Sequence, residues 1–366
     1  MPSSVAVAVD RSYVRCALGD DLPELAAAVR QGQPRGLTPA DDPQWASPQL
    51  GRIPDFDGRR ELGRKGTRTF DRATGLAVAA TERLIEAAGT ATMAGAEVGL
   101  VLGTTQGSIA TTLEFSGQGL VGPKPYLVEA GRFPNTVMNF AAGQAAIRQR
   151  LTGPNATVIA GRVTGVTALR YACRMLAGGQ ADAVVAGAIE ELSPARDWLE
   201  HRSSRLQPGQ PVAEGCALTL LRRAADCPGA APIIVRAVAF RLAAVGDEQA
   251  GFEAMVRPWS AELAAAAEPV VLAPGDADPA GVERRAWSRL FGSGRPLDWL
   301  DVRTVLGDLG AACVPFQTAV ALTELAQAAP AASARHALVS AIDPTGYMGA
   351  VWFERLAPRS PAAPRG

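Results

Sequence analysis

Short uninterrupted apolar runs alternate with amphipathic segments along most of the chain. The runs predict buried strands at 4–9, 97–103, 157–160, 182–188, 215–222, 269–273, 337–341 and 349–353. Apolar residues at helical spacing predict helices at about 22–31, 69–88, 108–116, 134–150 and 164–177, and another that starts near Gly310. Strands that are apolar on both faces and alternate with helices indicate a sheet covered by helices on both sides, and therefore an α/β fold.

The second part of the chain repeats the order of elements seen in the first. The runs at 269–273, 337–341 and 349–353 follow the pattern of those at 97–102, 183–188 and 215–220, and the helices near 310 and 164 both follow a turn. We therefore expect two similar halves, residues 1–225 and 226–356, packed as one body. The tail at 357–366 is rich in proline and charge, and we expect it to be disordered.

Composition excludes several classes of partner. The 366 residues contain 36 Lys and Arg against 36 Asp and Glu, so no net charge attracts nucleic acid or an anionic membrane. The five cysteines lack CxxC spacing, which argues against structural disulfides and zinc. We find neither a signal-peptide pattern nor an apolar run of membrane-spanning length. We expect a cytoplasmic protein without a metal, a cofactor or a nucleic-acid partner.

An arginine occupies a turn where a nucleophile would be expected. Residues 153–165 have the pattern of a buried strand that turns sharply into a helix. The N-terminus of a helix favours developing negative charge, so this turn is a good place for a reacting group. The residue there is Arg162, whose guanidinium stays protonated and cannot attack a carbonyl.

Three stretches together resemble the β-ketoacyl synthases of type II systems, members of the condensing-enzyme or thiolase-fold family. They are Phe133-Pro134-Asn135 with the helix that follows it, Gly153-Pro154-Asn155, and residues 177–190. The resemblance covers nearly the whole chain and is more specific in the first half. It implies a thiolase-like α/β fold with five layers, α/β/α/β/α, built from two similar halves.

The resemblance also implies where the catalytic residues would stand. In that family a cysteine is acylated, and two histidines stabilise the negative charge that develops as carbon dioxide leaves. The cysteine position falls on Arg162, the first histidine position on Leu272 or Ala273, and the second on Gly307 or Asp308. None of these residues can perform the original chemistry.

The remaining candidate groups have simpler interpretations. An unpaired guanidinium would be costly to bury, so we expect Arg162 to pair with a carboxylate or a carbonyl group, with Asp308 as the first candidate and Glu190 as the second. Cys173 and Cys313 lie in predicted helices and are expected to be core residues rather than substitute nucleophiles. His201 lies in a polar run and is expected to be solvated. His336, the other histidine, also lies outside the motifs.

A possible acyl tunnel is implied by the non-catalytic subunits of the same family. In those subunits, the region corresponding to residues 108–116 lines a tunnel at the dimer interface. Ile109, Thr112 and Leu113 fall on one helical face, and together with Phe133 and Met138 they are candidates for the tunnel wall or interface. An ordinary core role explains each of them equally well.

The resemblance therefore implies a chain length factor, the inactive member of a ketosynthase heterodimer in bacterial polyketide or polyene synthesis. Its expected partners are a catalytic ketosynthase subunit and an acyl carrier protein that delivers the growing chain. Three alternatives stay open: a decarboxylase of malonyl carrier protein, an acyltransferase with a non-standard base, and a scaffold subunit without a tunnel.

Overall fold

The strands of a computed structural model form one large sheet and one small one. The structure describes residues 5–89, 96–203, 206, 209–227, 232–244, 246–265, 270–274, 281–292, 297–327 and 335–357. The ten-stranded sheet has the order β11-β10-β12-β13-β9-β1-β8-β6-β4-β5. Its strands are β1 (Val7–Arg15), β4 (Val98–Gly103), β5 (Asn155–Val158), β6 (Ala183–Glu190), β8 (Gly215–Arg223), β9 (Ile233–Leu242), β10 (Val270–Pro274), β11 (Leu297–Trp299), β12 (His336–Ile342) and β13 (Tyr347–Arg355). The small sheet joins β2 (Thr38–Pro39), β3 (Gln49–Gly51) and β7 (Val212–Ala213).

Helices connect these strands, and several begin or end at the residues that capping chemistry favours. The Asp21 side chain accepts a hydrogen bond from the Glu24 N–H at the start of α1, and Gly32 ends that helix in the left-handed region. The helices are α1 (Leu22–Gln31), α2 (Gly58–Leu62), α3 (Arg72–Ala88), α5 (Ile109–Val121), α6 (Phe140–Gln149), α7 (Thr164–Ala177), α8 (Pro194–Arg202), α9 (Glu248–Ala265), α10 (Val282–Phe291), α11 (Arg303–Leu306) and α12 (Cys313–Gln327). Short 3₁₀ turns lie at η1 (Ala130–Thr136), η2 (Gly161–Val163) and η3 (Gly310–Ala312).

The large sheet consists of two halves with the same internal order. In β1-β8-β6-β4-β5 the successive pairings are antiparallel, antiparallel, parallel and parallel, and β9-β13-β12-β10-β11 follows the same series. The halves are joined where β1 pairs with β9 through Ala8–Ile234 and Val9–Ile233. The strand order agrees with the repeat expected from the sequence, whereas the domain boundary at residue 225 stays a prediction. We expected the tail at 357–366 to be disordered. Residues 358–366 lie outside the described residues.

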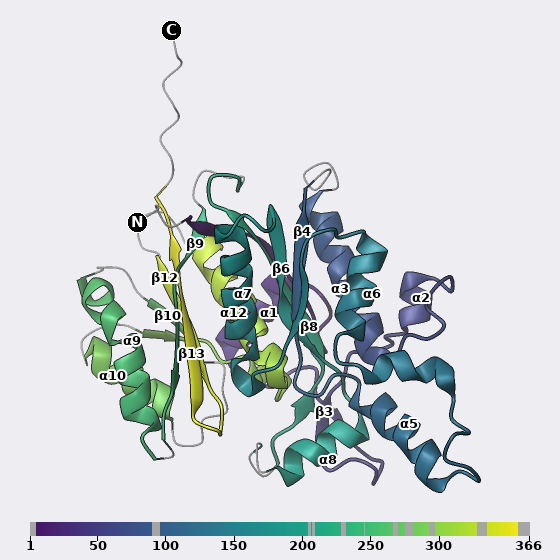
Figure 1. Cartoon of the computed structure of the whole chain (residues 1–366). Helices are drawn as coiled ribbons and strands as arrows, with labels where there is room; N and C mark the ends of the chain where they lie inside the picture. Colours follow the sequence, from purple (N-terminus) through teal and green to yellow (C-terminus); the bar gives the residue numbers. More distant parts are fainter. Residues whose placement is uncertain are drawn as a thin grey trace.

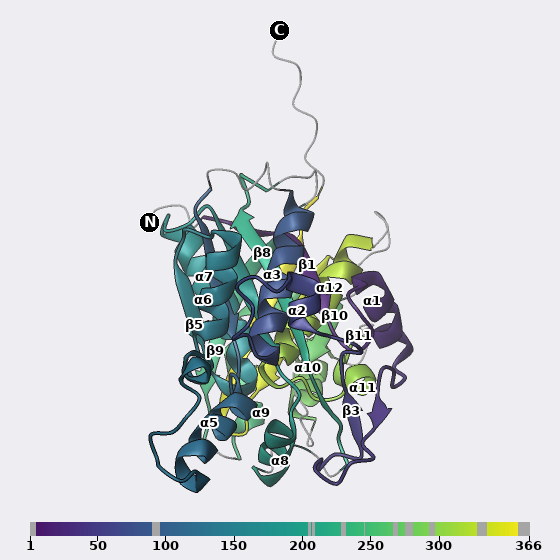
Figure 2. The same cartoon turned by 90° about the vertical axis from the view of Figure 1, so that its right-hand side faces the viewer.

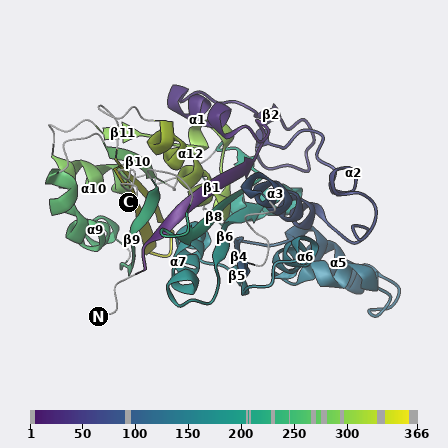
Figure 3. The ribbon, with the colours of Figure 1, turned by 90° about the horizontal axis from the view of Figure 1, so that it is seen from above.

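Five layers are visible in Figure 1, from α9 and α10 through one half-sheet, the central helices and the other half-sheet to α3 and α6. The central helices α7 and α12 contact strands of both half-sheets, and Figure 3 shows them between the two halves from above. Helix α12 is apolar on nearly every side, which is the pattern of a helix enclosed by protein. This is the thiolase-like arrangement that the resemblance implied.

Two elements differ from the predicted boundaries near the candidate site. The predicted helix 134–150 is divided into η1 and α6, and Pro134 lies inside η1, where its missing N–H and fixed φ disfavour a continuous α-helix. The predicted strand 157–160 is β5, which ends at Val158 because the chain already turns toward η2. The helix is therefore divided, and the strand lies two residues earlier in the chain than predicted.

Close packing of the central helices makes a testable prediction about Gly165. A Cβ at this position would lie 2.4 Å from Pro315 Cδ and 2.8 Å from Val314 Cβ, so α7 and α12 touch there. We expect Gly165→Ala to lower the free energy of unfolding by about 1–3 kcal/mol, because added volume strains a packed core. Gly143→Ala in α6 is the control, since a Cβ there meets nothing within 4 Å. It should be neutral or stabilising by up to about 1 kcal/mol. Equal thermal midpoints for the two variants would contradict this.

Candidate functional site

The turn between β5 and α7 holds Arg162 inside the protein. Gly161 precedes it with a φ of +54°, in the left-handed region that favours glycine. A Cβ at Gly161 would lie 1.9 Å from Asp343 Oδ2, so a side chain cannot fit there. Arg162 itself is only 3% exposed. The local geometry thus directs a long cation into the space between the half-sheets.

The guanidinium of Arg162 forms an ion pair with Asp308. The distance from Arg162 Nη1 to Asp308 Oδ2 is 2.6 Å, and Asp308 is fully buried. Asp308 Oδ1 also accepts a hydrogen bond from the Gly310 N–H at 2.9 Å. Burial alone would raise the pKa of Asp308, but Arg162 and Arg196 outweigh it and hold that pKa below its usual value. The predicted pairing is confirmed.

The backbone of Arg162 is bonded to a second carboxylate. Its N–H donates to Asp343 Oδ2 at 2.9 Å, and Asp343 Oδ1 accepts from the N–H and hydroxyl of Thr345. An N–H in this position, next to the N-terminus of α7, is the kind of donor that stabilises negative charge in an acyl-transfer reaction. Here a carboxylate of the chain itself occupies it.

Glu190, the second candidate partner, pairs with a different arginine. Its Oε1 accepts from the N–H and hydroxyl of Thr105, both at 2.6 Å, and from the Ala311 N–H at 3.2 Å. Its Oε2 lies 3.6 Å from Nε of Arg196, and both side chains are fully buried. Burial raises the pKa of Glu190. Two buried ion pairs, Arg162–Asp308 and Arg196–Glu190, therefore lie beside η3, and Glu190 is not the partner of Arg162.

The histidine positions carry residues with different surroundings. Leu272 packs in the cluster beneath α9 and α10, whereas Ala273 belongs to the central cluster between the half-sheets, because successive residues of β10 face opposite sides. Leu272 therefore lies on the opposite face of the half-sheet from the central layer that holds Arg162. Gly307 has a φ of +89°, and a Cβ there would lie 2.8 Å from the Pro211 carbonyl oxygen. Of the two residues proposed for the second histidine, only Asp308 has a side chain at this site.

Neither of the two cysteines considered as substitute nucleophiles has an activated thiol. Cys173 is partly buried in α7, and burial raises its pKa to about 12. Cys313 is completely buried at the start of α12, and burial raises its pKa as well. A thiolate is the reactive form of cysteine, so both thiols are poor nucleophiles at neutral pH.

His201 is not the solvated side chain that its polar neighbours suggested. Its side chain is 20% exposed, and its Nε2 lies 2.8 Å from Ser47 Oγ and 3.4 Å from Asp197 Oδ1. The Ala46 and Ser47 N–H groups donate to Asp197, which fastens this loop onto α8. The prediction of a solvated His201 was wrong because the loop of Ala46 and Ser47, which covers it, is about 150 residues away in the chain.

The tunnel candidates are divided between the surface of the molecule and one small cavity. Ile109 and Thr112 are half-buried on α5, while Leu113 and Phe133 are 54% and 58% exposed. Met138 is half-buried and lines a cavity of about 10 Å³ beneath the junction of η1 and α6. Phe133 packs against Phe115 at 5.8 Å between ring centroids, on the surface of the molecule.

Exposed apolar side chains gather on the segments that include these candidates. Figures 2 and 3 show α5, α6 and β5 side by side at one flank of the molecule. Strand β5 is the last strand of the large sheet, so one of its edges has no neighbouring strand in the described chain. We call this flank the apolar face; its exposed residues are Leu113, Leu120, Val121, Tyr126, Leu127, Phe133, Val137, Ile147 and Ile159.

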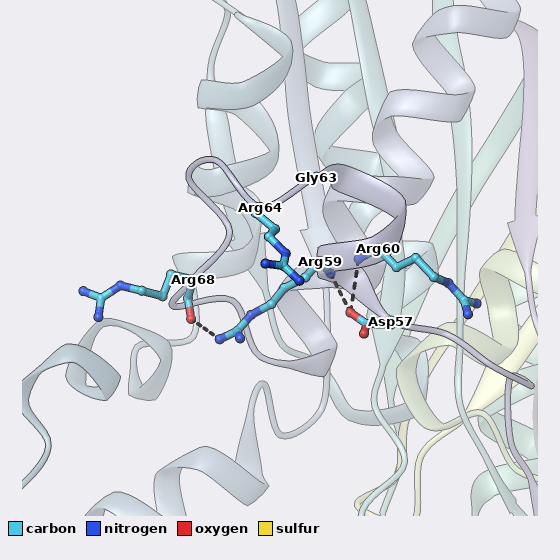
Figure 4. A pocket seen from close by; sticks show the side chains of 6 residues that line it. All are labelled: Asp57, Arg59, Arg60, Gly63, Arg64 and Arg68. Carbon is cyan, nitrogen blue, oxygen red and sulfur yellow. Dashed lines mark hydrogen bonds between the residues drawn. The ribbon is translucent and has the colours of Figure 1, made fainter.

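A basic pocket opens beside α2 and the loop that follows it. Its cavity of about 870 Å³ is shown in Figure 4 and is lined by Asp57, Arg59, Arg60, Gly63, Arg64 and Arg68. Asp57 accepts hydrogen bonds from the Arg59 and Arg60 N–H groups, so it caps α2. A second cavity of about 340 Å³ shares Arg59 and Arg68 with the first. The arginines outnumber the single carboxylate, and the pocket suits an anion.

The described residues show neither a metal-binding cluster nor a membrane-spanning helix. No group of three or more His, Cys, Asp or Glu side chains is arranged to hold a metal ion within the ranges given above. Over those same ranges, no helix has the length and apolarity needed to cross a bilayer.

The Arg162–Asp308 pair predicts a characteristic result in a double-mutant cycle. Arg162→Met should lower the free energy of unfolding by about 3–5 kcal/mol, because it removes the guanidinium that is ion-paired with a buried carboxylate. Arg162→Met combined with Asp308→Asn should recover part of that loss. Arg83→Met is the control, since the Arg83–Glu86 pair is exposed, and should change stability by less than about 1 kcal/mol.

The pH dependence of the same variants gives a second measurement. The pKa of Asp308 is lowered in the folded protein, so its contribution to stability is present above the unfolded pKa and is lost as pH falls through the folded pKa. Without Arg162, burial should raise that pKa, so Arg162→Met should become relatively more stable in mild acid. The free energy of unfolding is measured in urea as a function of pH. If it changed in parallel for the wild type and Arg162→Met, or if the effects of the two single substitutions simply added in the double variant, the coupling between Arg162 and Asp308 would be refuted.

Comparison with known proteins identifies the family. Residues 44–226 match the family model of the β-ketoacyl synthase N-terminal domain. The 3-oxoacyl-[acyl-carrier-protein] synthase 2 of Vibrio cholerae is 29% identical over 155 residues, which are 42% of this chain and 37% of that protein. Its counterpart from Vibrio harveyi is 30% identical over 39% of this chain and 35% of its own length. The matched region thus spans little more than a third of these curated relatives.

Solved structures match over almost the entire chain. The ishigamide ketosynthase/chain length factor superposes with a TM-score of 0.82 and 31% identity, covering 96% of this chain and 100% of that one. The complex AntDE:AntF contains a type II acyl carrier protein with its ketosynthase. It superposes with a TM-score of 0.77 and 17% identity, covering 96% of this chain and 100% of that one. At this identity the match supports the fold alone. With its thiolase-like fold and these matches, the chain belongs to the β-ketoacyl synthase family.

Proposed function

We propose that this chain is a non-catalytic chain length factor that pairs with an active ketosynthase in the cytoplasm. In this role it shapes the acyl tunnel during elongation of a polyketide or polyene chain. The observation that carries the proposal is the buried, ion-paired Arg162 at the nucleophile position. A guanidinium does not form a thioester, so acylation at this position requires a different subunit.

Several further features support the loss of catalysis. The Arg162 N–H is already bonded to Asp343, so the donor that would stabilise an oxyanion is occupied. Asp308, at the second histidine position, is a carboxylate that is held ionised and cannot donate a proton to developing negative charge. A decarboxylase or an acyltransferase on this fold would need the same donors, so these alternatives are less favoured.

The apolar face supports the heterodimer. Contiguous exposed apolar patches on a protein surface commonly mark an interface, and an open edge strand is normally paired or covered. Here α5, α6 and β5 bring both features to one flank. We propose that a ketosynthase of the same fold covers this face about a pseudo-two-fold axis, with its own equivalent strand near β5. Such obligate interfaces are large and apolar.

The basic pocket supports a second partner. An acyl carrier protein presents its chain on a phosphopantetheine arm, whose phosphate is an anion, and complementary charge guides such encounters. The arginines of Figure 4 supply that charge on this chain. We propose that an acyl carrier protein is the donor of the growing chain here.

The proposal predicts where elongation depends on a reactive group. Replacing the partner ketosynthase's nucleophilic cysteine with alanine should abolish elongation by the reconstituted pair. Cys313→Ala and Cys173→Ala in this chain should leave the rate within about twofold, because neither thiol is activated. The measurement is product formation from malonyl and acyl carrier proteins. Elongation that survives loss of the partner's cysteine would refute the proposal.

The apolar face predicts which substitutions separate the subunits. Ile159→Asp places a charge beside the open edge of β5, where a partner would bury it, and should weaken association at least tenfold. Leu242→Asp is the control, because Leu242 is 71% exposed at the end of β9, in the other half-sheet. Sedimentation of mixtures with the partner measures both. Unchanged association for Ile159→Asp would show that the interface lies elsewhere.

A further inference from the structure

We infer that a groove between α7 and β9 is a binding site for a linear aliphatic carboxylate. The inference goes beyond the proposed function and does not depend on it. Figures 1 and 3 show α7 next to β9, and the groove between them has a volume of about 360 Å³. Small-molecule sites commonly have volumes of about 300–1,000 Å³, so the groove has room for a small ligand.

The groove is separate from the sites described above. It lies toward the end of α7 that is opposite Arg162, and none of its residues belongs to the apolar face or to the basic pocket. The lining residues come from the start of β1, from α7 and from β9. They are Val5, Ala6, Val7, Arg170, Cys173, Arg174, Ala177, Ile234, Val235, Arg236, Ala237 and Val238.

Most of the groove is apolar and incompletely covered. Val235 and Val238 of β9 pack against the central cluster between the half-sheets, yet both are only half-buried. Cys173 lines the groove from α7 and is half-buried as well. A hydrocarbon chain in the groove would remove this apolar surface from water, which is favourable.

Two arginines without a counter-charge stand on one face of α7 beside these apolar walls. Arg170 and Arg174 are one helical turn apart, so they lie on the same side of the helix. Neither forms an ion pair with a carboxylate in the part of the chain that the structure describes, and α7 contains no Asp or Glu. Like charges at this spacing repel each other. An anion bound by both guanidinium groups would relieve that repulsion.

A cation–π contact fixes the position of Arg170. Its Cζ lies 5.0 Å from the centroid of the Phe240 ring, so the side chain reaches from α7 to β9. Such a contact orients the guanidinium but leaves its positive charge in place. The paired N–H donors of arginine match the two oxygens of a carboxylate. Arg170 is therefore placed to hold a carboxylate at the groove.

The third arginine of the groove already has partners within the chain. Arg236 lies 3.0 Å from Glu262 and 3.5 Å from Glu354, measured between the charged groups. Its charge is balanced, so we assign the head of the ligand to Arg170 and Arg174. The hydrocarbon chain would lie along the apolar walls. A ligand therefore needs both a negative head and an aliphatic chain, which neither an alcohol nor a short acid provides.

The test measures decanoate binding by isothermal titration calorimetry, using the chain in the form in which it is purified, alone or with a partner subunit. Decanoate should bind. Decanol lacks the charge and butyrate lacks the length, so each should bind at least about tenfold more weakly. The double variant Arg170→Met, Arg174→Met should weaken decanoate binding by at least about the same factor. Arg64→Met in the basic pocket is the control and should bind decanoate as the wild type does.

Cys173 gives a second readout that locates the bound ligand. It lines the groove, and the other four cysteines are buried. Decanoate at about ten times its Kd should slow alkylation of Cys173 by N-ethylmaleimide about tenfold, because about nine in ten grooves are then filled. Peptide mass spectrometry measures the alkylation.

Four results would overturn the inference. They are a lack of decanoate binding, equal binding of decanoate and decanol, loss of binding in Arg64→Met, and unchanged alkylation of Cys173 at saturating decanoate. The alkylation result needs no arginine variant, so it decides the matter even if the double variant does not fold.

Discussion

The ion pair between Arg162 and Asp308 joins the two halves of the molecule at the position where a condensing enzyme would carry its chemistry. Arg162 comes from the turn before α7, and Asp308 from the segment before α12. Each charge makes the other less costly to bury. Asp343, from the turn between β12 and β13, adds a third contact by accepting the Arg162 N–H. The pocket is thus fixed by contacts that cross between the half-sheets.

Fixing the pocket in this way leaves the rest of the fold intact. The apolar clusters around α7 and α12, beneath α3 and α6, and beneath α9 and α10 do not depend on a reactive thiol or imidazole. Catalytic residues can therefore be lost while the layers and the apolar face persist. The flank formed by α5, α6 and β5 keeps its exposed apolar residues whatever side chain stands at the nucleophile position.

Secondary structure was easiest to predict from the sequence where both faces of a strand are buried, because the apolar run is then uninterrupted. Strands β4, β6 and β12 are buried on both faces, so their uninterrupted apolar runs were recognisable. Helices α9 and α10 and strand β9 were not predicted. Strand β9 is interrupted by Arg236 and Arg241, and α9 contains Pro258, so neither has a clean period. Their identity depends on contacts with distant segments rather than on local pattern.

The same limit applies to the candidate site. The Arg162–Asp308 pair could be predicted because the family fold brings the two positions together. The sequence could not decide whether the first histidine position falls on Leu272 or on Ala273. A shift of one residue along a strand moves a side chain to the opposite face of the sheet. Gly307 was a plausible position until its positive φ and the nearby Pro211 carbonyl were known. These details depend on backbone geometry that spacing alone does not reveal.

The most direct measurement is intact-protein mass spectrometry of the subunit pair during turnover with an acyl carrier protein donor. It reports which polypeptide carries the acyl group, independently of the product that is released. We predict an acyl adduct on the partner ketosynthase and none on this chain at any time point. An acyl adduct on this chain that forms and disappears at the rate of elongation would contradict the central claim that its pocket is chemically inert.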